Sequence, residues 1–257
     1  MPVRVRYTPQ AAFPDVMDIE RSFRFGQLVE LAVTELRMHR SPHPCGEGNF
    51  GERQLVVESS CTARHDEGRT LPGDEQKQWM LDTLRDSDAR WRMLGLPIPF
   101  SPIAIAQLPP AVYETDHWDG YTAERAELLS ALNGVENLVV FAGDMHAFGA
   151  ATLLGGYPDG DAIGTEFITS CAAATPIASI NPPANVFLQN ANILANNPHF
   201  ELWDGTRNGW LEVEFTRTEC TVAMRAMQAQ LPAANSSIEL AKFTVPNGSP
   251  TLNQSVI

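Results

Sequence analysis

The sequence predicts an α/β protein whose C-terminal portion is antiparallel. A helix is expected over residues 122–132, and it runs directly into the short apolar strand 137–142. A helix followed at once by a fully apolar strand is typical of a sheet that is covered by helices. Apolar residues then alternate with acidic or polar residues over 211–215 and 220–224, which predicts strands with one buried face.

The N-terminal part is predicted to contain two strands, a long loop and a helix. Apolar and β-branched residues favour strands at 23–25 and 28–33. Residues 40–72 are rich in Gly, Pro, His, Ser and Arg and lack periodicity, and loops of that length are usually functional or mobile. Acidic residues at the start and an apolar face at helical spacing predict a helix over 74–85.

Further elements are expected along the rest of the chain. Residues 91–94 and 103–106 are interpreted as short strands or buried runs, and 164–169 as another strand. Pro182-Pro183 opens a helix that Pro198 closes, because proline fits the first turn of a helix and not its interior. We expect residues 1–257 to form a single domain.

Composition excludes two classes of function. With 18 Lys+Arg against 31 Asp+Glu, the net charge is −13, which disfavours coating of nucleic acids. No run of about 18 apolar residues is present, so no membrane-spanning helix is expected. The first seven residues also lack the apolar stretch of a signal peptide, and the chain as it stands is expected in the cytoplasm.

The four cysteines contain no CxxC pair, which argues against a zinc ribbon or a thioredoxin-type site. Buried thiols are the favoured interpretation, and a Cys45–Cys61 disulfide is the alternative if the protein is secreted. The long loop also carries histidines, but their spacing fits no zinc-finger pattern.

Gly143-Asp144-Met145-His146 directly follows the buried strand 137–142. Ligands of open α/β sheets bind at the carboxyl ends of strands, and Asp144 and His146 would share one side of an extended backbone. A carboxylate and an imidazole suit a divalent or trivalent metal. The tetrapeptide alone leaves an equal alternative, in which Asp144 caps the next segment and His146 is a core histidine.

Several motifs together resemble the downstream half of the PhoD-like alkaline phosphatases. The matching segments follow the order of that family and span nearly the whole chain. They are Arg21–Gly26 leading to Glu35-Leu36-Arg37, where Glu35 replaces an Asp; Glu75–Leu81; Ser87–Trp91; Trp118-Asp119-Gly120-Tyr121 with Glu124-Arg125; Gly143–His146; Asn197-Pro198-His199; and Asn208-Gly209-Trp210.

This resemblance implies a metal-dependent phosphoester hydrolase with part of a metallophosphatase-like α/β sandwich, in which helices cover the outer faces of mixed sheets. It implies that Asp144 and His146 are metal ligands in a site that the family fills with calcium and iron. The acidic, Cys, Tyr and Asn ligands of the family's upstream half have no counterpart here, so an upstream-half chain is the expected partner. The alternative is a non-catalytic remnant that acts as a binding or assembly module. The family is commonly periplasmic or secreted.

Three other residues are candidates for contact with a phosphoester, and no catalytic residue is assigned. Trp118 would form an apolar wall and His199 would donate to phosphate; alternatively Trp118 is core and His199 lies on a loop. Arg37 would clamp the phosphate because its guanidinium is a bidentate donor, or it forms a structural ion pair. The serines lack a Gly-x-Ser-x-Gly elbow, which disfavours a serine hydrolase.

Overall fold

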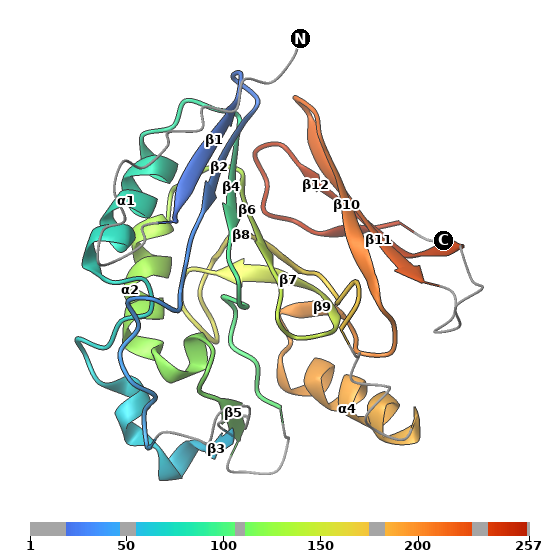
Figure 1. Ribbon diagram of the computed structural model, residues 1–257. Helices are drawn as coiled ribbons and strands as arrows, with labels where there is room; N and C mark the ends of the chain where they lie inside the picture. Colours follow the sequence, from blue (N-terminus) through green and yellow to red (C-terminus); the bar gives the residue numbers. More distant parts are fainter. Residues whose placement is uncertain (1–18, 47–54, 106–110, 175–182, 228–235, 256–257) are drawn as a thin grey trace.

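The computed structural model describes residues 19–46, 55–105, 111–174, 183–227 and 236–255. Its centre is a seven-stranded mixed sheet, the main sheet, with strand order β1-β2-β4-β6-β8-β7-β9 (Figure 1). Strands β2, β4, β6 and β8 are parallel, whereas β1, β7 and β9 run antiparallel to their neighbours. The bounds are β1 Arg21–Phe25, β2 Val29–Val33, β4 Trp91–Gly95, β6 Leu138–Ala142, β7 Phe148–Leu154, β8 Ala162–Ile168 and β9 Phe200–Asp204.

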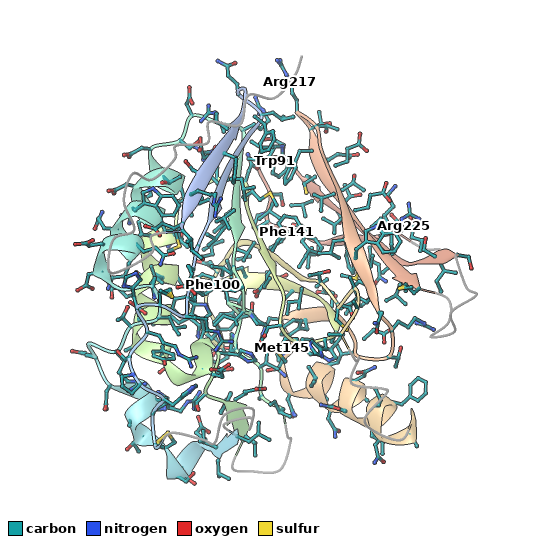
Figure 2. The ribbon with its side chains drawn as sticks, in the orientation of Figure 1. Trp91, Phe100, Phe141, Met145, Arg217 and Arg225 are labelled. Atoms are coloured by element: carbon teal, nitrogen blue, oxygen red, sulfur yellow. A yellow bond between two sulfur atoms is a disulfide. The ribbon has the colours of Figure 1, made fainter. Side chains whose placement is uncertain are left out.

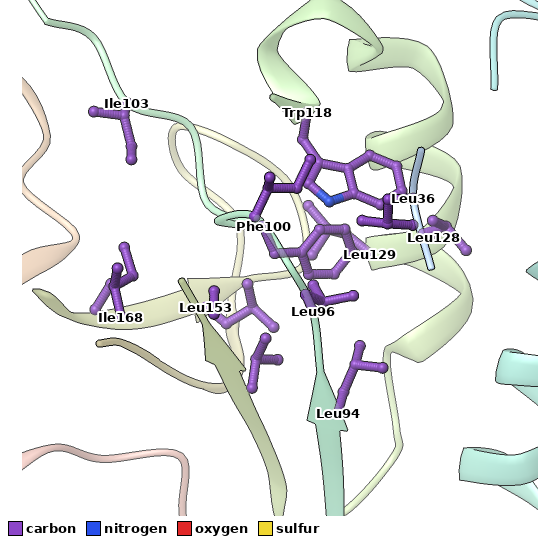
Figure 3. Close-up of a cluster of buried hydrophobic side chains, with 14 of the residues drawn as sticks. Leu36, Leu94, Leu96, Phe100, Ile103, Trp118, Leu128, Leu129, Leu153 and Ile168 are labelled. Atoms are coloured by element: carbon purple, nitrogen blue, oxygen red, sulfur yellow. The ribbon is translucent and has the colours of Figure 1, made fainter. Parts of the chain in front are cut away.

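Two helices, α1 (Asp74–Arg85) and α2 (Thr122–Leu132), cover one face of the main sheet (Figure 1). Their inward side chains, such as Leu84 and Leu128, are fully buried in one apolar cluster with Leu94 of β4. Figure 3 shows this cluster around Leu94 and Leu128. Both helices agree with the predicted ranges, because their apolar face and their end signals are local in sequence.

A smaller, four-stranded antiparallel sheet packs on the opposite face of the main sheet. Its strands are ordered β10-β11-β12-β13. Phe243 and Val222 of this sheet share a buried cluster with Trp91 and Phe167 of the main sheet. Figure 2 shows Trp91 and Phe141 between the two sheets. The bounds are β10 Gly209–Phe215, β11 Glu219–Met227, β12 Ser237–Pro246 and β13 Asn253–Gln254.

The outer face of the smaller sheet carries no helix within the described residues. Trp210, Glu212 and Glu214 of β10 alternate with inward residues and are exposed. Glu212 and Glu214 keep their part of that face in contact with water. The expected helices on the outer faces are therefore present on the main sheet, while the prediction is wrong for the smaller sheet as far as it is described.

Additional elements lie at the end of the main sheet where its parallel strands finish (Figure 1). They are helix α4 (Pro183–Asn196), the two-stranded pair β3 (Leu55–Val57) and β5 (Val112–Glu114), and the 3₁₀ turns η1 (Glu58–Ser60), η2 (Thr62–His65) and η3 (Trp118–Gly120). Helix α4 confirms the helix expected before Pro198, although Pro182 lies outside the described residues. Of the two alternatives for 103–106, the buried run is confirmed at Ile103 and Ala104, whereas residues 103–105 form no strand and residue 106 is not described.

Cys45 and Cys61 form a disulfide, whereas Cys171 and Cys220 are free. The favoured interpretation as buried thiols is therefore wrong for the first pair and right for Cys220, which is fully buried. No helix in the described part of the chain is long and apolar enough to cross a membrane.

Candidate functional site

The candidate site lies at the carboxyl ends of β2 and β6. After β6, residues 143–146 form a tight turn in which the Met145 N–H donates to the Gly143 carbonyl at 2.9 Å. Asp144 and His146 have φ angles of 71° and 51°, and Met145 between them is buried in the same apolar cluster as Leu94 and Leu128. Left-handed backbone at residues other than glycine costs on the order of 1–3 kcal/mol and is concentrated at functional sites. The premise of an extended backbone here is therefore wrong.

The Asp144 carboxylate faces the His117 imidazole and the Arg37 guanidinium. Its Oδ2 lies 2.9 Å from Nε2 of the buried His117 and 3.8 Å from Nη2 of Arg37. The hydrogen bond with His117, together with the charges of His117 and Arg37, lowers the pKa of Asp144 below its usual range. Burial opposes protonation of His117, but the hydrogen bond to Asp144 and the nearby Glu114 carboxylate outweigh it and raise the His117 pKa. Asp144 is thus stabilised as an anion.

A second carboxylate, Asp116, contacts Arg37, Arg40 and His43. We call residues 37–43, which carry these side chains, the cationic segment. Its Oδ2 accepts a hydrogen bond from Nη1 of Arg37 at 2.6 Å, and its Oδ1 accepts one from Nη1 of Arg40. His43 Nε2 lies 3.3 Å from the same Oδ1. Burial alone would raise the Asp116 pKa, but the hydrogen bonds from Arg37 and Arg40 lower it. Arg37 therefore links Asp116 to Asp144.

Glu35 shapes the turn that brings Arg37 to this point. Its carboxylate accepts the backbone N–H groups of Arg37 and Met38, both at 2.6 Å. Its own backbone N–H donates to Oε1 of Gln76 at 2.7 Å, and its carbonyl accepts from Nε2 of Gln76 at 2.6 Å. Glu35 therefore caps the turn that follows β2.

Contacts from two other regions fasten the cationic segment and the residues after it. The Tyr121 hydroxyl donates to the Ser41 carbonyl at 2.7 Å, and the Ser41 N–H donates to the Thr70 carbonyl at 2.7 Å. The Cys45–Cys61 disulfide adds a covalent link just beyond it. The segment has no regular secondary structure, and these links replace the hydrogen bonds that a helix or strand would supply.

The Asp119-Gly120 pair has a structural role in the loop before α2. Asp119 is buried, and its carboxylate accepts a hydrogen bond from Arg125 at 2.7 Å and one from the Ile103 N–H at 2.9 Å. A Cβ atom at Gly120 would lie 2.2 Å from the carbonyl oxygen of Thr115. Only glycine fits at this close approach of two backbone segments.

Asp144 and His146 carry a carboxylate and an imidazole, which are side chains of the kind that ligate metal ions. The described residues contain no group of three or more His, Cys, Asp or Glu side chains that could hold one. Calcium takes six to eight oxygen ligands, so two side chains fit a part of such a site and not a whole one. In this conformation the Asp144 Oδ2 also pairs with His117.

Trp118 and His199 contact aromatic rings and a backbone carbonyl. Trp118 is 1% exposed and packs edge-on against Phe100, with ring centroids 5.1 Å apart (Figure 3). The His199 ring lies 4.8 Å from that of Tyr157, and its Nε2 contacts the Pro102 carbonyl at 3.1 Å. Burial lowers the His199 pKa to about 4, so the ring is neutral at neutral pH. Their contact with a substrate stays a prediction.

Sequence reasoning missed Asp116, His117 and Arg40, and it treated His43 only as one of the loop histidines whose spacing fits no zinc-finger pattern. Asp116 and His117 directly precede the Trp118–Tyr121 motif, and this neighbourhood was the one sequence signal that could have pointed to them as site residues. Arg37, by contrast, was singled out and does lie beside Asp144.

The charged site lies at the carboxyl ends of parallel strands, which is where open α/β sheets commonly bind ligands. A family model described as PhoD-like phosphatase matches residues 1–224, and the chain belongs to this family. The chain is 28% identical over 229 residues to "Alkaline phosphatase D" of Bacillus subtilis (strain 168), which covers 88% of the chain and 37% of that relative. A solved structure titled "Structure of PhoD" matches with a TM-score of 0.78 and 24% identity, covering 100% of the chain and 47% of that structure, and this likeness concerns the fold.

The chain spans less than half the length of the relatives that it matches. Membership of the family supports a phosphoesterase function. The expected resemblance to PhoD-like phosphatases is thereby confirmed.

Proposed function

We propose that this chain forms one part of a metal-dependent phosphoester hydrolase, with its reaction centre at residues 143–146. The observation that carries the proposal is the strained turn at the end of β6, where Asp144 and His146 both adopt positive φ beside Arg37. Asp144 and His146 would act as metal ligands, and residues of the upstream half of the catalytic domain would supply the others. The main sheet and the smaller sheet would then belong to a metallophosphatase-type sandwich.

The bound metals, calcium and iron by resemblance to the family, would polarise the phosphoryl oxygen and supply an activated hydroxide. Of the chain's own residues, Arg37 would bind phosphoryl oxygens with its Nη2, which lies 3.8 Å from Asp144 and outside hydrogen-bond distance of it. His117 would orient the Asp144 carboxylate through its 2.9 Å contact.

A small anionic substrate needs local positive charge, because the net charge of the chain is −13. Arg37 and Arg40 supply two guanidinium groups, but the carboxylates of Asp116 and Asp144 offset them. Bound metal would therefore supply the positive charge that attracts a phosphoester, and Arg37 would orient it.

The Cys45–Cys61 disulfide supports a proposal about the compartment. Disulfides persist in oxidising compartments and are rare in the cytoplasm. We therefore propose that the protein matures outside the cytoplasm, as the resemblance to a commonly secreted or periplasmic family also implies.

The test is hydrolysis of bis-p-nitrophenyl phosphate, with and without added Ca²⁺ and Fe³⁺. The chain is assayed alone and after co-expression with the upstream half of a family member. Asp144→Asn and His146→Ala should each lower kcat/KM by at least about 100-fold, because a lost metal ligand removes charge stabilisation of the transition state. Asp86→Asn, which changes an exposed carboxylate after α1, serves as the matched control and should leave kcat/KM unchanged. Near-parental activity of both site variants would refute the ligand assignment.

A second candidate is a non-catalytic remnant that acts as a binding or assembly module. It is favoured by the two-ligand composition of the site within the described residues. Absence of metal-dependent hydrolysis both alone and with the upstream half, in a folded protein, would select this alternative.

A further inference from the structure

Asp116 occupies an unusual position for a surface carboxylate. Its two oxygens are divided between Arg37 and Arg40, and His43 adds a third contact. The side chains involved are partly shielded from water, with 26% of Asp116 and 15% of His43 exposed. Exposed ion pairs contribute little, whereas a network in a partly buried place is screened less.

The geometry of Arg37 depends on this contact. One terminal nitrogen, Nη1, lies 2.6 Å from Asp116, which leaves Nη2 on the side of Asp144 at 3.8 Å. Met38, next to Arg37, is 55% exposed, so the side chains of this turn are not all fixed by packing. A free arginine side chain loses rotamer entropy when it is ordered, and a guanidinium that is already held avoids this loss on binding.

We propose that Asp116 is a positioning residue, which fixes Arg37 so that its second nitrogen faces a phosphoryl group bound beside Asp144. This inference rests on the proposed function, because the phosphoryl group is the substrate's. Asp116 touches no substrate itself. It acts through Arg37, and through Arg40 it adds a second guanidinium to the same anchor.

Asp116 also has a competing effect, which acts against the binding of phosphate. A carboxylate beside two guanidinium groups repels an incoming phosphate and competes for the same donors. If competition dominates, removing the carboxylate strengthens phosphate binding; if positioning dominates, removing it weakens binding. The sign of the change therefore separates the two effects.

The experiment measures protection of Arg37 by inorganic phosphate against phenylglyoxal, read by peptide mass spectrometry on the intact chain. Four proteins are compared: the parent, Asp116→Asn, Asp116→Glu and the control Asp88→Asn. Asp88 is 80% exposed and pairs with Arg24, so the control removes an arginine–carboxylate contact outside the site. Thermal unfolding is recorded for each protein, so that loss of fold is recognised.

We expect the phosphate concentration for half-protection of Arg37 to rise about tenfold in Asp116→Asn, on the scale of one lost charge-assisted hydrogen bond. It should be unchanged in Asp88→Asn and partly restored in Asp116→Glu, which keeps the charge. A merely structural role would lower the unfolding temperature of Asp116→Asn without a specific loss at Arg37.

Equal or tighter protection in Asp116→Asn would overturn the proposal, as would an equal loss in Asp88→Asn or no restoration in Asp116→Glu. Failure of the proposed function has a different signature, because the parent itself would then show no protection of Arg37 by phosphate. That result would also overturn the positioning role.

Discussion

The Cys45–Cys61 disulfide is expected to contribute about 3 kcal/mol to the stability of the folded chain. The two cysteines are 16 positions apart, and cross-linking a loop of that size removes about 3 kcal/mol of conformational entropy from the unfolded chain. The perturbation is the double substitution Cys45→Ala and Cys61→Ala. Because Tyr121 and Thr70 still contact Ser41, the folded state should keep the cationic segment in place.

Urea unfolding, followed by circular dichroism, measures this contribution. The parent in the absence of reductant should unfold at higher urea than the parent with dithiothreitol, by a free energy of about 3 kcal/mol. The double variant should match the reduced parent and be insensitive to dithiothreitol, which is the internal control. Alkylation of the unfolded protein with iodoacetamide reports whether both thiols are oxidised. Equal stability of the oxidised and reduced parent would refute the reasoning.

Three further outcomes are expected. Gly120→Ala should destabilise the chain by at least about 2 kcal/mol in thermal unfolding, because the new Cβ would lie 2.2 Å from the Thr115 carbonyl oxygen. Gly156→Ala is the control and should be tolerated, because no atom lies within 4 Å of the position of its Cβ. The free energy of unfolding should fall by up to about 3 kcal/mol as the pH drops from 6.5 to 4. His199 has a pKa of about 4 in the folded chain and 6.5 when unfolded, so over this range the unfolded chain binds a proton that the folded chain does not. His199→Gln should abolish this pH dependence in urea unfolding. Phe243→Ala, at a fully buried site between the sheets, should cost about 3–5 kcal/mol in the same assay, and a loss below about 1 kcal/mol would contradict the described packing.

The helices and the central strand were predictable because their signals are local. The helix over 74–85 and the strand over 137–142 show their period within a single window of sequence. Strand β7 was missed because its sequence, FGAATLL, is apolar and rich in small residues, and it is buried on both faces. Such a run has no alternation and no helical period, so pattern reasoning cannot assign it.

The residues of the candidate site also divide into those with a local sequence motif and those that only the fold brings together. Asp144, His146 and Arg37 were found from local motifs, whereas Asp116 was not. Asp116 and Arg37 are 79 positions apart, and only the fold brings their side chains to 2.6 Å. The left-handed backbone at Asp144 and His146 was also beyond sequence reasoning, because neither residue is the glycine that normally indicates it.

The central claim is that this chain supplies two ligands of a shared metal site. Elemental analysis of the 257-residue chain after gel filtration tests it most directly. If the chain provides only Asp144 and His146, it should retain less than one tightly bound metal ion per molecule, because hard cations need more ligands than two. Stoichiometric iron or calcium that survives gel filtration, and that is lost in Asp144→Asn, would contradict the claim and indicate a complete site within the chain.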